Sequence, residues 1–323
     1  TWLIGSFWSS RQMNSTRLIT IFVSVLAVIA LGYFMTTDPT SHFTEFHPGL
    51  DNRPDDLELS REEVAIGHIF RQFSGTPSTI PGNWPRFRGA DMDNISKETI
   101  KLADRWEASG PQLLWSVELG EGHSGPVVHD GKVYILDYNE EERADLLRCF
   151  SLDDGREIWQ RGYDIYIKRN HGMSRTTPAI AHNHIVTIGP KCHVMCVTAD
   201  SGKLVWGMDI EREFASEIPL WYTGQCPLID DSVAVIATGG KALLIGVHLL
   251  TGEILWQTPN PDNWKMSHSS VMPMTIYGRR IYVYCALGGL VGVSGDSATA
   301  GQVVFKTTAW DPNVIAPSPL YLG

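Results

Sequence analysis

The sequence lacks the signatures of several enzyme and nucleic-acid-binding classes. It contains no G-x-S-x-G nucleophile elbow, no H-E-x-x-H zinc motif and no glycine-rich phosphate loop before a helix. Charged residues make up only 19% of the chain, and the formal net charge is −10. No basic cluster overrides that average. Because sequence-independent binding to nucleic acid needs a dense Lys/Arg surface, we expect no nucleic-acid partner.

Cysteine is scarce and has no adjacent pair. The five cysteines stand at positions 149, 192, 196, 226 and 285. Cys192 and Cys196 have the spacing of half a metal site. On a strand, however, they would lie about 13 Å apart along one face, too far to form a disulfide or share a zinc ion. We therefore predict no metal site.

Only one long run without charge is present, at residues 18–35. Eighteen helical residues span roughly 27 Å, close to the hydrocarbon thickness of a bilayer. Arg11 and Arg17 precede the run, and acidic residues dominate the stretch after it. The positive-inside rule then predicts residues 1–17 in the cytoplasm, with Met13 a possible true start, and the chain after the run on the periplasmic or extracytoplasmic side.

A cleaved signal peptide is the alternative interpretation of this run. We favour a transmembrane anchor, because the run is longer than a usual signal core and the adjoining TTDP offers no small-x-small cleavage site. Residues 36–82 are interpreted as a linker. Within it, Ser60-Arg61-Glu62-Glu63 has the form of a capping box and predicts a short helix at about 61–73.

A nine-residue phrase recurs further along the chain, as SLDDGREIW (151–159), TADSGKLVW (198–206) and HLLTGEILW (248–256). The terminal aromatics Trp159, Trp206, Trp256 and Phe305 lie 47, 50 and 49 residues apart. A second set of markers keeps the same period: Pro126, Pro178, Pro227, Pro273 and Pro319 follow one another at 52, 49, 46 and 46 residues. Two landmarks at opposite ends of one unit therefore define an internal repeat.

Each unit contains four short strands, which in the second unit are PAIA, HIVTIG, HVMCVTA and KLVWGMD. Alternating apolar residues and Gly-containing turns join them as hairpins. Tandem four-stranded antiparallel sheets of this length predict an all-β chain, a β-propeller with four complete repeats visible. Cys149, Cys196 and Gly246 occupy the same place before the glycine of the phrase, which indicates a position reserved for small packed residues.

The phrase resembles the tryptophan-docking repeat of the pyrroloquinoline-quinone (PQQ) propeller superfamily, over residues 113–323. In that family the Trp packs between blades. The resemblance therefore implies docking roles for Trp115, Trp159, Trp206, Trp256 and Phe305. It also implies a full form of six to eight blades, of which this chain holds a part, with 113–119 as the outer strand of the last blade. NWPRFRG (83–89) and DNIS (93–96) look like the lead-in sequence of such repeat proteins found outside the bacterial cytoplasm, so we take residues 83–112 as a lead-in loop. A purely structural role is the alternative, in which Trp84 and Phe87 cover one face of the propeller.

The chain departs from the quinoprotein dehydrogenases of this superfamily. Those enzymes carry adjacent cysteines over the cofactor and hold calcium with a Glu/Asn/Asp set, and neither feature can be placed here. PQQ and calcium are accordingly expected only if the chain is such an enzyme. We assign no catalytic residue.

Loops that enter each innermost strand of a propeller surround the mouth of its central channel. In this chain those loops contain seven candidate ligand-binding residues: His123, His171, Arg175, Trp221, Tyr222, Gln225 and His268. Three histidines and an arginine on one face can bind a metal ion or an anionic ligand, or act as acid/base groups. The alternative is that these groups satisfy strand-end amides and one another.

We therefore predict a propeller held to the membrane by residues 18–35 that binds an envelope protein or a small-molecule or sugar ligand, and we favour binding over catalysis. The resemblance to the propeller lipoprotein of outer-membrane protein assembly supports scaffolding, although the first cysteine is Cys149, too far beyond the apolar run to carry a lipid anchor. The alternatives are a PQQ- and calcium-dependent quinoprotein dehydrogenase oxidising an alcohol or sugar, and a carbohydrate-binding module.

Overall fold

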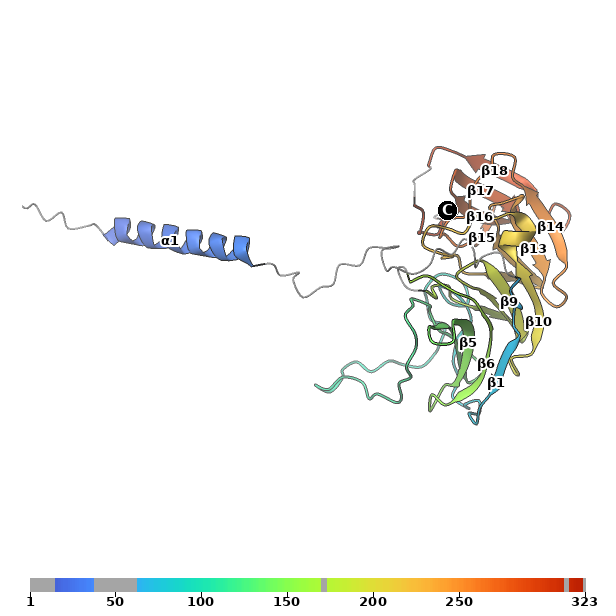
Figure 1. The fold of residues 1–323 in the computed structure, drawn as a ribbon, viewed down its shortest axis with the longest axis horizontal. Helices are drawn as coiled ribbons and strands as arrows, with labels where there is room; N and C mark the ends of the chain where they lie inside the picture. The colour runs from blue at the N-terminus through green and yellow to red at the C-terminus, as the bar shows by residue number, and fades with distance from the viewer. Residues whose placement is uncertain (1–14, 38–62, 170–172, 311–313, 322–323) are drawn as a thin grey trace, which may run out of the picture. The chain divides into compact units, whose positions relative to one another are not determined.

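The computed structural model describes residues 15–37, 63–169, 173–310 and 314–321. The chain divides into two compact units, Thr1–Leu50 and Asp51–Gly323. In the first, helix α1 (Ser15–Thr36) contains the predicted apolar run (Figure 1). By length and composition α1 is long and apolar enough to cross a membrane. A single helix of this kind near the N-terminus fits an anchor or a signal sequence equally well.

The second unit is built from four antiparallel sheets. The first contains β3 (Val127–His129), β4 (Lys132–Asn139), β5 (Ala144–Ser151) and β6 (Glu157–Asp164). The second contains β7 (Ala179–Ala181), β8 (His184–Ile188), β9 (His193–Thr198) and β10 (Leu204–Asp209). The third contains β11 (Leu228–Asp230), β12 (Val233–Ala237), β13 (Ala242–His248) and β14 (Ile254–Pro259). The fourth contains β15 (Met272–Ile276), β16 (Arg279–Ala286), β17 (Gly289–Ser294) and β18 (Val303–Thr307).

Within each of these groups of four the strands follow chain order, and consecutive strands pair with one another. The first strands of successive sheets, β3, β7 and β11, lie next to one another. The sheets follow one another in an arc (Figure 1). This is the arrangement of propeller blades with innermost strands at a common axis, and it confirms the predicted all-β, four-repeat fold. A short helix, α2 (Ile210–Phe214), follows β10 and is capped by Asp209, whose carboxylate accepts from the Arg212 amide.

The predicted helix at 61–73 is wrong. Residues 61 and 62 lie outside the described residues, and Ile69–Gln72 form strand β1 instead. β1 pairs antiparallel with the outer edge of β6, from Ile69 opposite Gly162 to Gln72 opposite Trp159. The Phe70 ring lies 4.1 Å from the Arg161 guanidinium. The open backbone of β6 and this cation–π contact outweigh the local helix signal, which is worth little without a tertiary partner.

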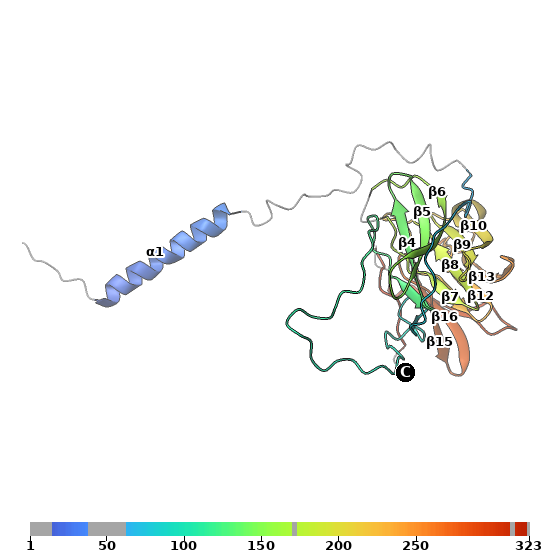
Figure 2. The same cartoon turned by 90° about the horizontal axis from the view of Figure 1, so that it is seen from below.

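The first blade is extended at both edges. After β1 the chain crosses the blade, with the Gly75 amide bonded to the Glu157 carbonyl, and reaches the inner edge. There β2 (Asn83–Trp84) pairs with β3, which makes a six-stranded sheet. Beyond Asn94 the chain forms a long segment without regular structure before β3 (teal in Figure 2). The expected strand at 113–119 lies in this segment and has no strand pairing.

Each repeat tryptophan lies against the glycine of the following repeat. A Cβ on Gly155, Gly202, Gly252 or Gly301 would come within 3.0 Å of Trp115, Trp159, Trp206 or Trp256, respectively, and all four glycines have positive φ. Only glycine meets both demands, because any side chain would strain the turn and strike the indole. The glycine turn of the phrase is therefore a packing surface for the tryptophan of the preceding blade.

The indole N–H groups show how this contact varies between blades. Trp115 and Trp206 donate to the carbonyls of Leu152 and Leu249, at 2.9 and 2.8 Å. Ala199 has the corresponding carbonyl in the repeat between these two. It accepts from the Tyr134 hydroxyl instead, and the buried Trp159 N–H has no hydrogen-bond partner among the described residues. The contribution of Trp159 to stability is therefore chiefly apolar.

The position that we predicted for small residues lies directly across from these aromatics. The cross-strand pairs are Cys149 with Trp159, Cys196 with Trp206, Gly246 with Trp256 and Gly292 with Phe305. All five cysteines are buried and free. Packing under an aromatic ring explains the small residue at each of these places.

Candidate functional site

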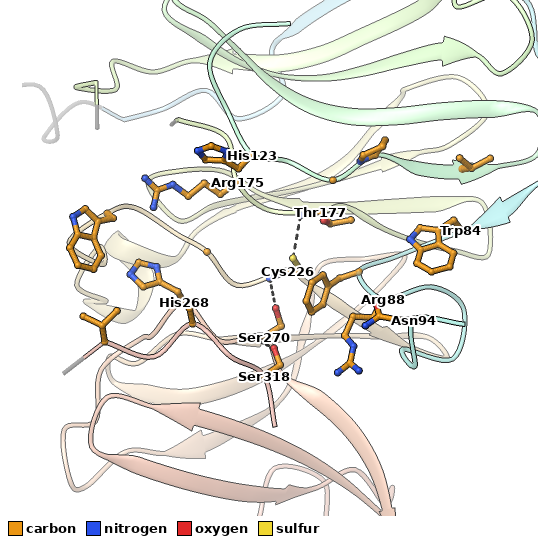
Figure 3. A pocket seen from close by; sticks show the side chains of 18 residues that line it. Trp84, Arg88, Asn94, His123, Arg175, Thr177, Cys226, His268, Ser270 and Ser318 are labelled. Atoms are coloured by element: carbon orange, nitrogen blue, oxygen red, sulfur yellow. Dashed lines mark hydrogen bonds between the residues drawn. The ribbon is translucent and has the colours of Figure 1, made fainter. Parts of the chain in front are cut away.

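The candidate site is a cavity of about 1060 Å³ inside the arc of inner strands. Its walls come from three parts of the chain: the lead-in segment, the loops before β3, β7, β11 and β15, and the segment at 314–318. Figure 3 shows His123, Arg175 and His268 on one side, with Trp84, Arg88 and Asn94 on the other. The volume suits a substantial ligand, since ordinary small-molecule sites measure roughly 300–1,000 Å³.

The lead-in segment closes one wall because it is tied to successive blades. Trp84 is paired into the first blade. The Pro85 carbonyl accepts from the Ile180 amide of the second, and the Arg86 guanidinium donates to the Ile229 carbonyl of the third at 2.7 Å. Met92 packs in the apolar core of the third and fourth blades. Phe87 and Arg88, between these attachments, line the cavity.

A ladder of hydrogen bonds joins the second, third and fourth blades at the cavity wall. The Thr177 amide donates to the Cys226 sulfur at 3.2 Å, and the Cys226 amide donates to the Ser270 hydroxyl at 2.9 Å (Figure 3). The Ser270 amide donates in turn to the Ser318 hydroxyl at 3.2 Å. Each amide precedes or starts an inner strand, where no sheet partner is available. Burial raises the pKa of Cys226, so its thiol is an acceptor in this wall and a poor nucleophile.

Four of the seven candidate residues line the cavity together: His123, Arg175, Trp221 and His268. The Trp221 and His268 rings stack, with centroids 6.0 Å apart and planes 28° from parallel. Burial, and then the nearby charge of Arg175, lower the pKa of His268, so its imidazole is neutral at pH 7. Burial also lowers the pKa of Arg175, which stays protonated at any ordinary pH.

Two of the other three candidates do not line it, and the third lies outside the described residues. Gln225 is fully buried, and its amide group bonds both the amide and the carbonyl of Ala237, at 3.0 and 2.6 Å. Gln225 therefore fulfils the alternative interpretation, in which a loop side chain hydrogen-bonds the backbone at the end of a strand. Tyr222 is buried, with its hydroxyl donating to the Lys168 carbonyl. His171 lies outside the described residues.

Residues of the lead-in segment complete the cavity, although they were not among the candidates. Trp84, Phe87, Arg88 and Asn94 line it. Arg88 has a φ of 64°, and its buried Nε has no hydrogen-bond partner among the described residues. This lining agrees with the alternative interpretation of the stretch, a loop whose Trp84 and Phe87 cover one face of the propeller, but the sequence did not point to Arg88 or Asn94.

The positive charge of the described walls comes from two arginines, Arg88 and Arg175, and the walls contain no carboxylate. Arg88, Arg175, His123 and His268 line the cavity, and none of its described lining residues is Asp or Glu. The absence of Asp and Glu from this lining does not reflect a shortage of acidic residues, because the chain has 36 acidic and 26 basic residues. An excess of basic groups in a low-dielectric hollow favours an anionic ligand.

The described walls do not fit the calcium–PQQ site of the dehydrogenases. Calcium takes oxygen ligands, usually with several carboxylates, and the described lining offers none. Nor does the described part of the chain contain a cluster of three or more His, Cys, Asp or Glu with metal-binding geometry. We therefore derive no redox step through this cavity.

The family model described as outer membrane protein assembly factor BamB matches residues 142–308, which is more than half of the chain. The chain belongs to this family. The match covers the blades from β5 to β18 and places the protein in the PQQ-like propeller superfamily, as the repeated phrase implied.

Individual relatives match over shorter parts. The serine/threonine-protein kinase AfsK of Streptomyces griseus is 29% identical over 188 residues, 55% of this chain and 21% of the kinase. The outer membrane protein assembly factor BamB of Salmonella typhimurium (strain LT2) is 25% identical over 140 residues, 40% of this chain and 34% of that protein. The chain thus spans a fifth to a third of the length of these curated relatives.

Solved structures of two kinds overlay on part of the chain. BamB from Moraxella catarrhalis gives a TM-score of 0.38 at 15% identity, covering 58% of this chain and 48% of that one. A europium-containing methanol dehydrogenase gives 0.36 at 11% identity, covering 61% and 53%.

Proposed function

We propose that the chain is a membrane-anchored scaffold whose propeller binds a protein partner at the mouth of the cavity. The observation that carries this proposal is Leu220. Its side chain is 77% exposed, and it directly precedes Trp221 of the cavity wall. Leu220 therefore offers a partner an apolar contact at a cavity wall that contains Trp221 and Arg175, and tryptophan and arginine are the residue types most often found in protein-binding hot spots.

The loop that presents Leu220 is held firmly at its base. Tyr222 has a φ of 66°, its amide bonds the Pro219 carbonyl, and its hydroxyl reaches the Lys168 carbonyl at 2.7 Å. The Thr223 amide bonds the Pro190 carbonyl of the neighbouring blade. A loop fixed in this way loses little conformational entropy when a partner binds, which raises affinity.

Two further findings support the cellular setting. The apolar helix α1 and the charge bias around it favour an anchor with the propeller on the extracytoplasmic side. The family description, outer membrane protein assembly factor, is that of a protein acting in the cell envelope. We infer that residues 18–35 anchor the chain and that an envelope protein is the partner.

The proposal is tested by affinity capture of the full chain from membranes after mild cross-linking. Replacing Leu220→Ser together with Trp221→Ala is expected to lower recovery of specific partner proteins at least about 10-fold, because hot-spot residues contribute about 2 kcal/mol or more each. Tyr277→Ala is the matched control, since Tyr277 is 97% exposed on a hairpin turn and does not line the cavity. If the double variant captures the same proteins as the control, this face is not the binding surface.

A further inference from the structure

We infer that the partner enters the cavity with an acidic, extended peptide segment that carries an apolar or aromatic side chain between its carboxylates. This inference rests on the proposed function, and it specifies the chemistry of the partner at the same site. Charge is its first support. Basic groups line the cavity and no described lining residue is acidic, although acidic residues predominate in the chain as a whole.

The arrangement of charge indicates an elongated ligand. His123, Arg175 and His268 come from the loops before β3, β7 and β15 and lie on one side, whereas Arg88 comes from the lead-in segment on the other (Figure 3). A ligand that meets both sides needs anionic groups at two separated points. Arginine suits this role, because its planar fork binds carboxylates through two parallel hydrogen bonds.

Arg88 supplies an independent sign of a missing ligand group. Its Nε is buried at the cavity wall and has no hydrogen-bond partner among the described residues. A buried cationic donor without an acceptor costs free energy, and an anionic group in the cavity beside the guanidinium would offset part of that cost. The position of Arg88 is fixed by its neighbours, since the amide of Asn94 bonds the Arg88 carbonyl and the ring of Trp84 lies against Gly89.

Apolar and aromatic side chains also line the cavity. Trp84, Phe87 and Trp221 line it, together with Val128 and Val314. The apolar surface also continues outside the mouth to Leu220. A compact anion would leave most of these contacts unused, whereas a peptide segment would use the arginines, the aromatic side chains and the apolar surface beyond.

The test uses the purified full chain in detergent and fluorescence anisotropy with defined probes. The first probe is a short labelled peptide with glutamates flanking a leucine and a tryptophan, and the second has lysine in place of every glutamate. We expect the acidic probe to bind at least about 10-fold more tightly. Arg88→Gln and Arg175→Gln should each weaken it by about 10-fold, because each removes a charge-assisted hydrogen-bonding pair.

Arg279→Gln is the control, because Arg279 pairs with Asp296 on a hairpin away from the cavity, and it should bind as the wild type does. Charge reversal guards against variants that merely misfold: Arg175→Glu should lose the acidic probe and gain affinity for the lysine probe. Citrate and inorganic phosphate are titrated as competitors.

Equal binding of the two peptides, or no binding of the acidic probe, would overturn the inference. So would citrate or phosphate that binds as tightly as the acidic peptide and depends on the same two arginines, since the site would then be one for small anions. None of these outcomes bears on capture of a partner through Leu220 and Trp221, so failure of the ligand chemistry and failure of the scaffold proposal are distinguishable.

Discussion

Replacing Trp159 by alanine is expected to lower the free energy of unfolding of the propeller by about 3–5 kcal/mol, the range for deleting a fully buried aromatic side chain. Trp159 is 1% exposed, packs on Gly202 of the next blade and lies 5.8 Å from the Tyr134 ring. Its N–H has no partner among the described residues, so the loss comes from apolar contacts and from the cavity left behind.

Phe305→Ala is the internal control for this substitution, because Phe305 holds the same repeat position but is 37% exposed. It should cost no more than about 2 kcal/mol, since part of its ring already contacts water. Urea unfolding of the detergent-solubilised chain, followed by circular dichroism, gives both values. Equal losses for the two variants would show that the aromatic residues of the phrase do not stabilise the interfaces between blades in proportion to their burial.

Asp145→Asn is expected to stabilise the protein by about 2–4 kcal/mol at pH 8 and to change little at pH 4. Asp145 is 2% exposed and accepts hydrogen bonds from the hydroxyls of Tyr163 and Ser174. Burial outweighs those bonds and raises the pKa of Asp145 to about 7. In the unfolded chain the same carboxyl titrates near about 4.

The sign follows from proton counting. Between pH 4 and pH 7 the folded state keeps a proton on Asp145 that the unfolded state has released, so stability falls as pH rises through that window. Asparagine has no proton to lose and keeps an oxygen for Tyr163, so the difference between variant and wild type should grow with pH. A roughly constant difference would mean that Asp145 is ionised at little cost.

Asp296→Asn should behave in the opposite way and serves as the reference for this pH series. Hydrogen bonds from the Arg280 amide, and then from the Arg279 side chain, lower the pKa of Asp296. A carboxylate of this kind adds stability above its unfolded pKa and loses it as pH falls. Its replacement should therefore destabilise at pH 8 and have a diminishing effect in acid.

Features that recur could be predicted from the sequence, because several copies support the same interpretation. The markers Trp159, Trp206 and Trp256 and the prolines located four blades, and the observed strands fall where the second repeat predicted them. The small residues opposite the aromatics, such as Cys149 and Gly246, were found in the same way. A residue type that recurs at the same place in several repeats indicates a packing requirement rather than chance.

Features that occur once were harder to predict. Ile69–Gln72 carry a capping signal upstream and look helical, but the free edge of β6, distant in sequence, accepts them as a strand. Gln225 and Trp221 belong to one loop, yet Gln225 turns into the blade to bond Ala237 while Trp221 lines the cavity. Local sequence does not report which way a loop side chain points. Arg88 reaches the cavity only because the lead-in segment folds across three inner strands.

The most direct test of the account is site-specific photo-crosslinking in cells. A photo-reactive phenylalanine analogue is placed at Leu220, and in a separate strain at Tyr277, which is also exposed but lies away from the cavity. We predict a discrete cross-linked adduct with another envelope protein from position 220 and none above background from position 277. Adducts of equal yield from both positions, or none from position 220, would contradict a partner-binding surface at the mouth of the cavity.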